Sequence, residues 1–205
     1  MAVSSESLKH KELRYKNISG VFGEEDSFSL HDVGMGLGDY CNFLNKYYSD
    51  RNIVYSGSDI FQDYVIESNR RFPDKKFYLR NLVTSSTEDK YDYLILSGVF
   101  HQRRDTSIKD WEQYMETLIN NCFAMCNKGI AFNAVTQFVD FYQPNIYYCN
   151  IHKLIESIND RLSRFFILKH DYALYELTVY VYKEEYIQQK YSEKEFEKYF
   201  HIKKK

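Results

Sequence analysis

The chain has 205 residues, enough for one domain with a full hydrophobic core, and a formal net charge of −2. This charge gives no general basic field to attract nucleic acid or anionic lipid. No apolar run approaches the ~18 to 20 residues that a membrane-spanning helix needs, and the polar first residues lack the apolar core of a signal peptide. We therefore expect a cytoplasmic protein with neither a nucleic-acid nor a membrane partner.

The first part of the chain leads into a closely spaced set of glycines. Residues 4–16 suit a short amphipathic helix, and residues 19–27 a loop. A buried strand is then predicted from residue 28, followed by the segment HDVGMGLGDY and a helix with an apolar face. Gly34, Gly36 and Gly38 lack a Cβ, so the turn can use positive φ angles and allow close approach of a ligand.

The end of this turn is also the N-terminus of a helix, which favours an anionic group such as a carboxylate. Asp32 precedes the glycines, and their spacing is GxGxG, which differs from the GxGxxG dinucleotide fingerprint. The pattern therefore indicates a cofactor other than a dinucleotide. An ordinary tight turn between a strand and a helix is the alternative.

Strands and helices alternate through most of the remaining chain. The second strand, residues 52–60, ends at an acid, and the helix after it stops at Pro73, which cannot continue it. Further strands are predicted at 75–83, at 91–98 and at 129–138, with a long helix at 108–126. A loop at 139–150 and a helix at 151–162 precede two strands without an intervening helix, RFFILKHDY and LYELTVYVYK.

This order predicts an α/β fold with a mostly parallel sheet, helices on both faces and an antiparallel strand pair at one edge. We expect a single domain over residues 1–205. It comprises an N-terminal helix and loop (1–27), a core (28–183) and an added C-terminal helix (184–205). In such sheets, ligands bind outside the carboxyl ends of the strands, at the point where the strand order reverses. The order is expected to reverse at the first strand, so we expect a ligand at its carboxyl end.

Several ordered motifs resemble the class I S-adenosylmethionine-dependent methyltransferases. HDVGMGLGDY is similar to the first motif of that family, SGSDIF to its acid-ending second strand, and YDYLILSGVF to its fourth strand. The closing strand pair resembles the reversed seventh strand of the family. The resemblance covers residues 28–183 and implies a Rossmann-like seven-stranded sheet in the order 3-2-1-4-5-7-6, with strand 7 antiparallel.

The resemblance implies S-adenosylmethionine as the cofactor and S-adenosylhomocysteine as the product. Asp32 is placed to hold the ammonium of the methionine end, and Asp59 to accept hydrogen bonds from the ribose hydroxyls. The alternative for Asp59 is an N-cap of the following helix. The implied cofactor-binding residues are Asp32, Gly34, Met35, Gly36, Gly38, Asp59, Ile60, Ser97 and Gly98.

On the acceptor side, the segment SGVFHQRRD follows the fourth strand, so His101 is the first candidate for a general base or a substrate-orienting residue. The alternative for His101 is a surface loop histidine. An arginine pair that includes Arg104 can bind a phosphate or carboxylate, or can be a solvated charge cluster. The expected substrate-binding residues are Arg104, Asn133, Asp140, Tyr148 and His170.

No Asp, Glu or His set has metal-ligand spacing, and the four cysteines suit reduced, buried thiols better than a zinc site. We therefore expect a metal-independent enzyme, monomeric or homodimeric, that acts on a small polar metabolite. No NPPY-like segment follows the fourth strand, which disfavours nucleobase or amide nitrogen as the acceptor.

The resemblance extends to small bacterial methyltransferases of surface-glycan and secondary-metabolite pathways. It favours O-methylation of a sugar or of a phosphate-bearing precursor of a surface polysaccharide. N-methylation of a small amine or amide is one alternative. A non-catalytic cofactor-binding partner subunit is another, and it predicts a cleft filled by aromatic side chains or covered by the C-terminal helix.

Overall fold

A computed structural model describes residues 7–85 and 87–200. Its strands are β1 (Ser27–Val33), β2 (Asn52–Asp59), β3 (Lys76–Leu79), β4 (Tyr91–Leu96), β5 (Cys126–Thr136), β6 (Tyr148–Cys149), β7 (Phe166–Lys169) and β8 (Glu176–Tyr182). Its α-helices are α1 (Leu8–Ser19), α2 (Asp39–Tyr47), α3 (Gln62–Arg71), α4 (Ile108–Met125), α5 (Ile151–Arg161) and α6 (Glu184–Lys190). Short 3₁₀ helices, η2 (Gly20–Phe22) and η3 (Lys194–Tyr199), complete the described elements.

The sheet has the order β3-β2-β1-β4-β5-β8-β7, which confirms the predicted topology. β1 to β5 pair in parallel, whereas β8 runs antiparallel to both β5 and β7. The one additional strand is β6, a two-residue strand that pairs with the end of β5. The sequence placed this segment in a loop, because two residues are too few to show any periodicity.

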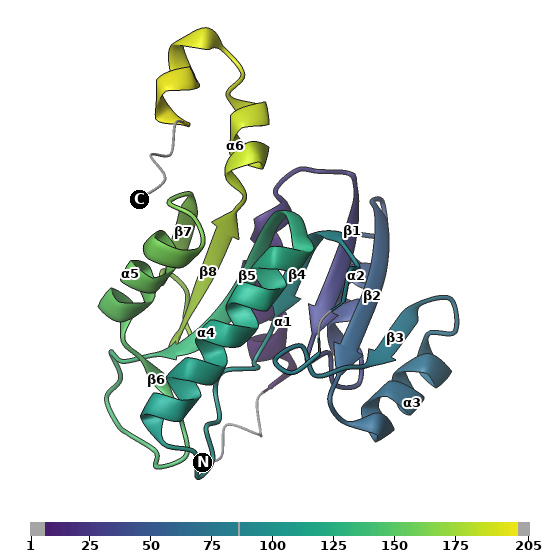
Figure 1. The fold of residues 1–205 in the computed structure, drawn as a ribbon. Helices are drawn as coiled ribbons and strands as arrows, with labels where there is room; N and C mark the ends of the chain where they lie inside the picture. The colour runs from purple at the N-terminus through teal and green to yellow at the C-terminus, as the bar shows by residue number, and fades with distance from the viewer. Residues whose placement is uncertain (1–6, 86, 201–205) are drawn as a thin grey trace.

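Apolar side chains form one core on each face of the sheet. α4 and α5 pack on one face, where Leu94, Leu96 and Phe132 are buried. α1 and α2 pack on the other face, over Leu30, Tyr93 and other strand side chains. Figure 1 shows α4 and α5 in front of the sheet with α1 behind it. The expected helices on both faces are therefore present.

The face that carries α4 and α5 is only partly covered near β1 and β2. The described residues between β3 and β4 contain no helix, and Val54 on this face is 64% exposed. His31 is nevertheless buried there, since its ring stacks on Tyr91 at 4.4 Å and its nitrogens lie 2.8 and 3.0 Å from the hydroxyls of Ser56 and Ser58. Burial lowers the pKa of His31 to about 3, so this histidine stays neutral in the fold.

Two boundaries differ from the sequence prediction. β5 begins at Cys126, directly after α4, and not at residue 129. The C-terminal extension is not one helix: α6 ends at Lys190, and η3 follows a short break. Residues 201–205, which the prediction included in the extension, lie outside the described residues.

The extension lies at the edge where the parallel strands begin. Because α6 follows antiparallel β8, it starts at the edge opposite the carboxyl ends of β1 to β5 (Figure 1). The hydroxyl of Tyr186 in α6 donates to Glu25, and the Tyr93 hydroxyl also donates to Glu25, at 2.6 Å. Lys128 pairs with the same carboxylate. The Tyr186 hydrogen bond therefore ties the extension to Glu25, away from the predicted ligand-binding edge.

Replacing Tyr186 by Phe tests this anchor. Loss of a hydrogen bond to a partly buried carboxylate predicts a decrease of about 1–3 kcal/mol in the free energy of unfolding, measured by urea titration. The control is Tyr191→Phe, at a half-exposed position of the same extension, for which we expect a change within about 0.5 kcal/mol. Equal losses in the two variants would contradict this account of the anchor.

Candidate active site

The glycine turn lies at the carboxyl end of β1 and is fixed by the tip of β2. The backbone N–H groups of Gly34 and Met35 donate to the Ser58 carbonyl at 2.8 and 3.2 Å. Gly34, Gly36 and Gly38 have φ angles of +72°, +56° and +74°. These angles lie in the left-handed region that residues with a Cβ rarely adopt.

Space is also restricted at two of these glycines. A Cβ on Gly34 would lie 2.8 Å from the Val99 side chain, and one on Gly38 would lie 2.8 Å from the Phe72 ring. No heavy atom lies within 4 Å of a Cβ built on Gly36, so the middle of the turn is open. Met35 has a different environment, because its side chain is buried and its sulfur packs over Gly57.

Asp59 ends β2 and binds the backbone of the glycine turn. Its Oδ2 accepts from the Gly36 N–H at 3.0 Å, and its Oδ1 accepts from the Phe61 N–H at 3.0 Å. α3 begins at Gln62 without a side-chain cap, so the N-cap alternative for Asp59 is wrong. Ile60 is 58% exposed, which leaves an apolar side chain on the surface directly beside this carboxylate.

Asp32 is buried beneath the turn. Its Oδ2 accepts a 2.7 Å hydrogen bond from the Tyr55 hydroxyl. Burial raises the pKa of Asp32 to about 7, with a further contribution from the charge of Asp59, although the Tyr55 hydrogen bond opposes the shift. A cation beside Asp32 would favour its ionised form, which is the chemistry expected of a residue that binds an ammonium group.

The tip of β4 is tied to β5 through Asn133. Gly98 has a φ of +74°, and its N–H donates to Asn133 Oδ1 at 2.8 Å. The Asn133 amide nitrogen donates to Glu176 at the start of β8 and lies 3.1 Å from Nε2 of His101. The Nε2 atom of His101 thus lies within hydrogen-bonding distance of an amide nitrogen, which is a donor. Asn133 is completely buried and uses both ends of its amide.

Glu176 also forms a buried ion pair with Arg14 of α1. Nε of Arg14 donates to Glu176 Oε2 at 2.9 Å, and a terminal nitrogen of the guanidinium donates to Oε1. Both residues are less than a tenth exposed. Burial raises the pKa of Glu176, but the opposing effects, led by the Arg14 hydrogen bond, are larger, and the pKa lies below its usual value. Glu176 is therefore a fixed carboxylate.

His101 belongs to a buried network of polar contacts that it forms with Asn133, Glu176 and Arg14. It is 5% exposed, its Nε2 lies 3.7 Å from Glu176 Oε2, and its carbonyl accepts from the Tyr147 N–H at 2.9 Å. The alternative of a surface loop histidine is therefore wrong. A catalytic role for His101 stays a prediction.

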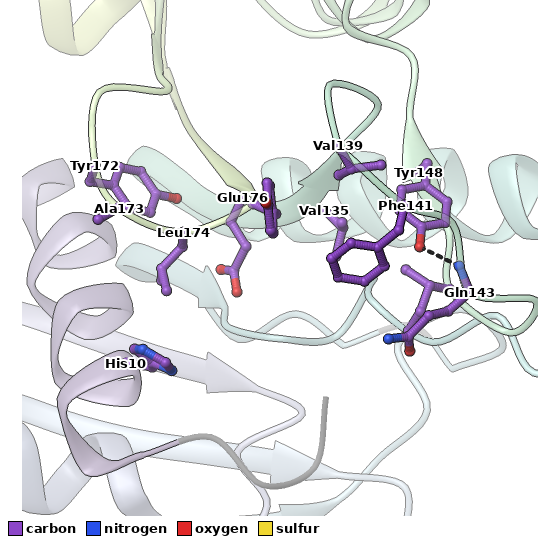
Figure 2. A pocket seen from close by; sticks show the side chains of 12 residues that line it. His10, Val135, Val139, Phe141, Gln143, Tyr148, Tyr172, Ala173, Leu174 and Glu176 are labelled. Carbon is purple, nitrogen blue, oxygen red and sulfur yellow. Dashed lines mark hydrogen bonds between the residues drawn. The ribbon is translucent and has the colours of Figure 1, made fainter. Parts of the chain in front are cut away.

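A cavity of about 570 Å³ lies beside the network, at the carboxyl end of β5 (Figure 2). It lies between α1, the segment from β5 to β6 and the segment from β7 to β8. Its lining consists of His10, Val135, Val139, Phe141, Gln143, Ile146, Tyr148, Tyr172, Ala173, Leu174, Tyr175 and Glu176. The network thus reaches the cavity through the Glu176 side chain.

The predicted substrate-binding residues have different positions. Tyr148 lines the cavity, and its hydroxyl accepts from the Gln143 N–H at 2.7 Å. Arg104, Asp140 and His170 are exposed and do not line this cavity, although Asp140 accepts a hydrogen bond from Tyr175, which does. Asn133 lies within the network.

Sequence analysis missed Arg14 and Glu176. Arg14 lies on a helix of mixed charge, and Glu176 begins a mostly apolar strand, so neither provides a strong local signal. Arg103, the neighbour of Arg104, binds the carbonyls of Thr106 and Pro144 and so holds two loops together.

The four cysteines are buried thiols, as predicted, and burial raises the pKa of Cys41, Cys126 and Cys149 to about 12. Among the described residues, no group of three or more His, Cys, Asp or Glu side chains is placed to hold a metal ion. Nor does any described helix have the length and apolar character to cross a membrane.

The sheet order and the glycine turn define the class I methyltransferase fold, and known proteins agree with this assignment. The chain is 27% identical over 160 residues to a Mycobacterium tuberculosis (strain ATCC 25618 / H37Rv) protein named "Putative methyltransferase Rv1506c", a match over 77% of this chain and 95% of that one. No family model matches the chain.

Solved structures share the fold. One is the magnesium protoporphyrin IX methyltransferase of Synechocystis PCC 6803 with bound S-adenosylmethionine, with a TM-score of 0.61 at 12% identity over 85% of this chain and 79% of that one. Another is the N-methyltransferase NodS of Bradyrhizobium japonicum WM9, with a TM-score of 0.58 at 11% identity over 85% of this chain and 95% of that one. The resemblance inferred from the motifs is thereby confirmed at the level of the fold.

The buried ion pair between Arg14 and Glu176 predicts that substitutions of the two residues have non-additive effects on stability. Arg14→Met leaves the Glu176 carboxylate buried without its cation, so we expect a loss of about 3–5 kcal/mol in the free energy of unfolding. In the double variant Arg14→Met/Glu176→Gln no charge is stranded, and we expect it to be no less stable than Arg14→Met alone. Urea unfolding of both single variants and the double variant measures the coupling. Additive losses would contradict a direct ion pair.

Asp32 predicts a specific dependence of stability on pH. Its folded pKa of about 7 lies above its usual value of 3.8, so the unfolded chain ionises first as the pH rises. The free energy of unfolding should therefore fall between pH ~4 and ~7, by at most about 4 kcal/mol at about 1.4 kcal/mol per pH unit. Asp32→Asn removes this contribution, so the difference in stability between the two proteins should change over this range. A constant difference from pH ~4 to ~7 would contradict the shift.

Proposed function

We propose that this protein is an S-adenosylmethionine-dependent methyltransferase that acts on a small molecule. The observation that carries the proposal is the pairing of the glycine turn with the Asp59 carboxylate at the carboxyl edge of the parallel strands. A cavity of about 570 Å³ lies at the same edge, at the end of β5. Homology to a methyltransferase and a shared fold with a structure that contains S-adenosylmethionine support the same conclusion.

The residues at the strand tips suit this cofactor. Gly36 is open at the centre of a turn in which a Cβ would be strained, so an amino-acid moiety can approach the backbone. We assign the ammonium to buried Asp32 and the ribose hydroxyls to Asp59, whose oxygens can accept further hydrogen bonds beside those from the backbone. Ile60 supplies exposed apolar surface for the adenine. When bound, this cofactor would supply a methyl group on a sulfonium; an acceptor atom attacks the methyl carbon in line, and the carbon–sulfur bond breaks to leave S-adenosylhomocysteine.

The protein contributes mainly by positioning the nucleophile. The Gly98 turn is held by Asn133, and Asn133 is held by Glu176, so the tip of β4 and the wall of the cavity have a fixed relation. We propose that the acceptor lies in the cavity and that His101, within hydrogen-bonding distance of Asn133, orients this wall.

Among small molecules, we favour O-methylation of a sugar or of a phosphate-bearing precursor of a surface polysaccharide, as the sequence resemblance implies. The cavity supports an acceptor-binding enzyme over a non-catalytic partner subunit, because it is not filled by its aromatic side chains. In addition, α6 and η3 lie at the opposite edge of the sheet and do not cover it (Figure 1).

Calorimetric titration with S-adenosylhomocysteine tests the cofactor assignment. We expect wild-type protein to bind S-adenosylhomocysteine about 10-fold or more tightly than its 2′-deoxy analogue, because Asp59 accepts a hydrogen bond from the ribose. In Asp59→Asn this preference should shrink to about 3-fold or less, since the charged acceptor is lost.

The matched control is Asp63→Asn, an exposed carboxylate on α3, which should keep the wild-type preference. An unchanged preference in Asp59→Asn would show that Asp59 binds only the backbone of the glycine turn and not the ribose. Failure of the wild-type protein to bind S-adenosylhomocysteine would refute the proposed function itself.

A further inference from the structure

The charge of the cavity restricts which acceptor can enter it. Glu176 and His10 are the ionisable groups of its wall apart from the tyrosines, and none of the described residues that line it is lysine or arginine. The pKa of Glu176 lies below its usual value, so this side chain presents an ionised carboxylate at the wall, balanced by Arg14 behind it. An anionic group placed here would face this carboxylate, and the described lining offers no lysine or arginine to bind it.

The cation nearest to Glu176 is already engaged. Arg14 donates from Nε to Glu176 Oε2 at 2.9 Å and from a terminal nitrogen to Oε1, and its side chain is buried. A guanidinium that binds a carboxylate with two nitrogens has its charge largely neutralised by that partner. Because Arg14 does not line the cavity, a phosphate there would meet the carboxylate side of this pair.

The remaining wall is aromatic and aliphatic. Phe141 and Tyr148 contribute rings on one side, while Tyr172 and Leu174 lie on the other, with the Glu176 carboxylate between them (Figure 2). The Phe141 ring is 55% exposed and makes an edge-on contact with Tyr175 at 5.9 Å. Exposed ring faces bind flat apolar surfaces, including the C–H face of a sugar ring, and a carboxylate accepts hydrogen bonds from hydroxyl groups.

We infer that this cavity binds an uncharged, ring-shaped acceptor, of the size of a sugar, with a ring face against Phe141 and a hydroxyl that donates to Glu176. The inference rests on the proposed function and narrows it: of the two acceptors favoured above, it selects the neutral sugar over the phosphate-bearing precursor. A volume of about 570 Å³ is in the range of small-ligand sites.

A matched pair of sugars tests the inference. Saturation-transfer NMR, with and without S-adenosylhomocysteine, compares methyl α-D-glucopyranoside with α-D-glucose 1-phosphate, which share a ring and differ in charge. We expect millimolar binding of the neutral glycoside and binding of the phosphate weaker by about 10-fold or more. In Glu176→Gln the discrimination against the phosphate should shrink, because the carboxylate at the wall is gone and the charge of Arg14 is no longer balanced.

Phe141→Ala provides a second variant that does not disturb the buried ion pair. It should weaken binding of the neutral glycoside about 5-fold or more, whereas Phe138→Ala, at a 60% exposed position of the same loop outside the cavity wall, should not. Circular dichroism of each variant verifies that it is folded.

Three results would overturn the inference: equal or tighter binding of glucose 1-phosphate, binding of neither sugar at millimolar concentration, or unchanged binding in Phe141→Ala. The proposed function fails by a different measurement, namely the absence of S-adenosylhomocysteine binding in calorimetry. Sugar binding without S-adenosylhomocysteine remains measurable in that case, so the two failures are distinguishable.

Discussion

A buried carboxylate, Glu176, connects the parts of this protein that form its functional edge. A charge removed from water is costly unless other groups satisfy it, and here Arg14 and Asn133 do so. The three residues belong to α1, β5 and β8, so satisfying one charge fixes two strands and the first helix relative to each other. Asn133 extends the same constraint to the Gly98 turn. The arrangement of the cavity wall thus depends on electrostatic compensation in addition to apolar packing.

How much the sequence could predict depends on how local each signal is. The glycine turn was predictable because Asp32, Gly34, Gly36 and Gly38 lie within seven consecutive residues that alternate in a recognisable pattern. Asp59 was predictable from its position at the end of a strand. Sheet order followed from the alternation of strands and helices and from the resemblance, and the structure has that order.

The surroundings of the cavity were less predictable because their contacts are long-range. Arg14 and Glu176 are 162 residues apart, and nothing in their neighbourhoods indicates that they meet. His101 was found by its position after β4, but its burial depends on Asn133 and Glu176, which a local pattern does not show. Arg104, by contrast, resembles an anion-binding residue in sequence and is exposed in a loop outside the cavity. Residue type identified possible chemistry, whereas the fold decided which groups meet.

The two ends of the Asn133 amide connect the tip of β4 with the wall of the cavity. Its oxygen accepts from the Gly98 N–H at the tip of β4, and its nitrogen donates to Glu176, which lines the cavity. Because an amide group is planar, rotating it to satisfy one side would break the hydrogen bond on the other. The Gly98 turn and the Glu176 side chain are therefore positioned by one planar group.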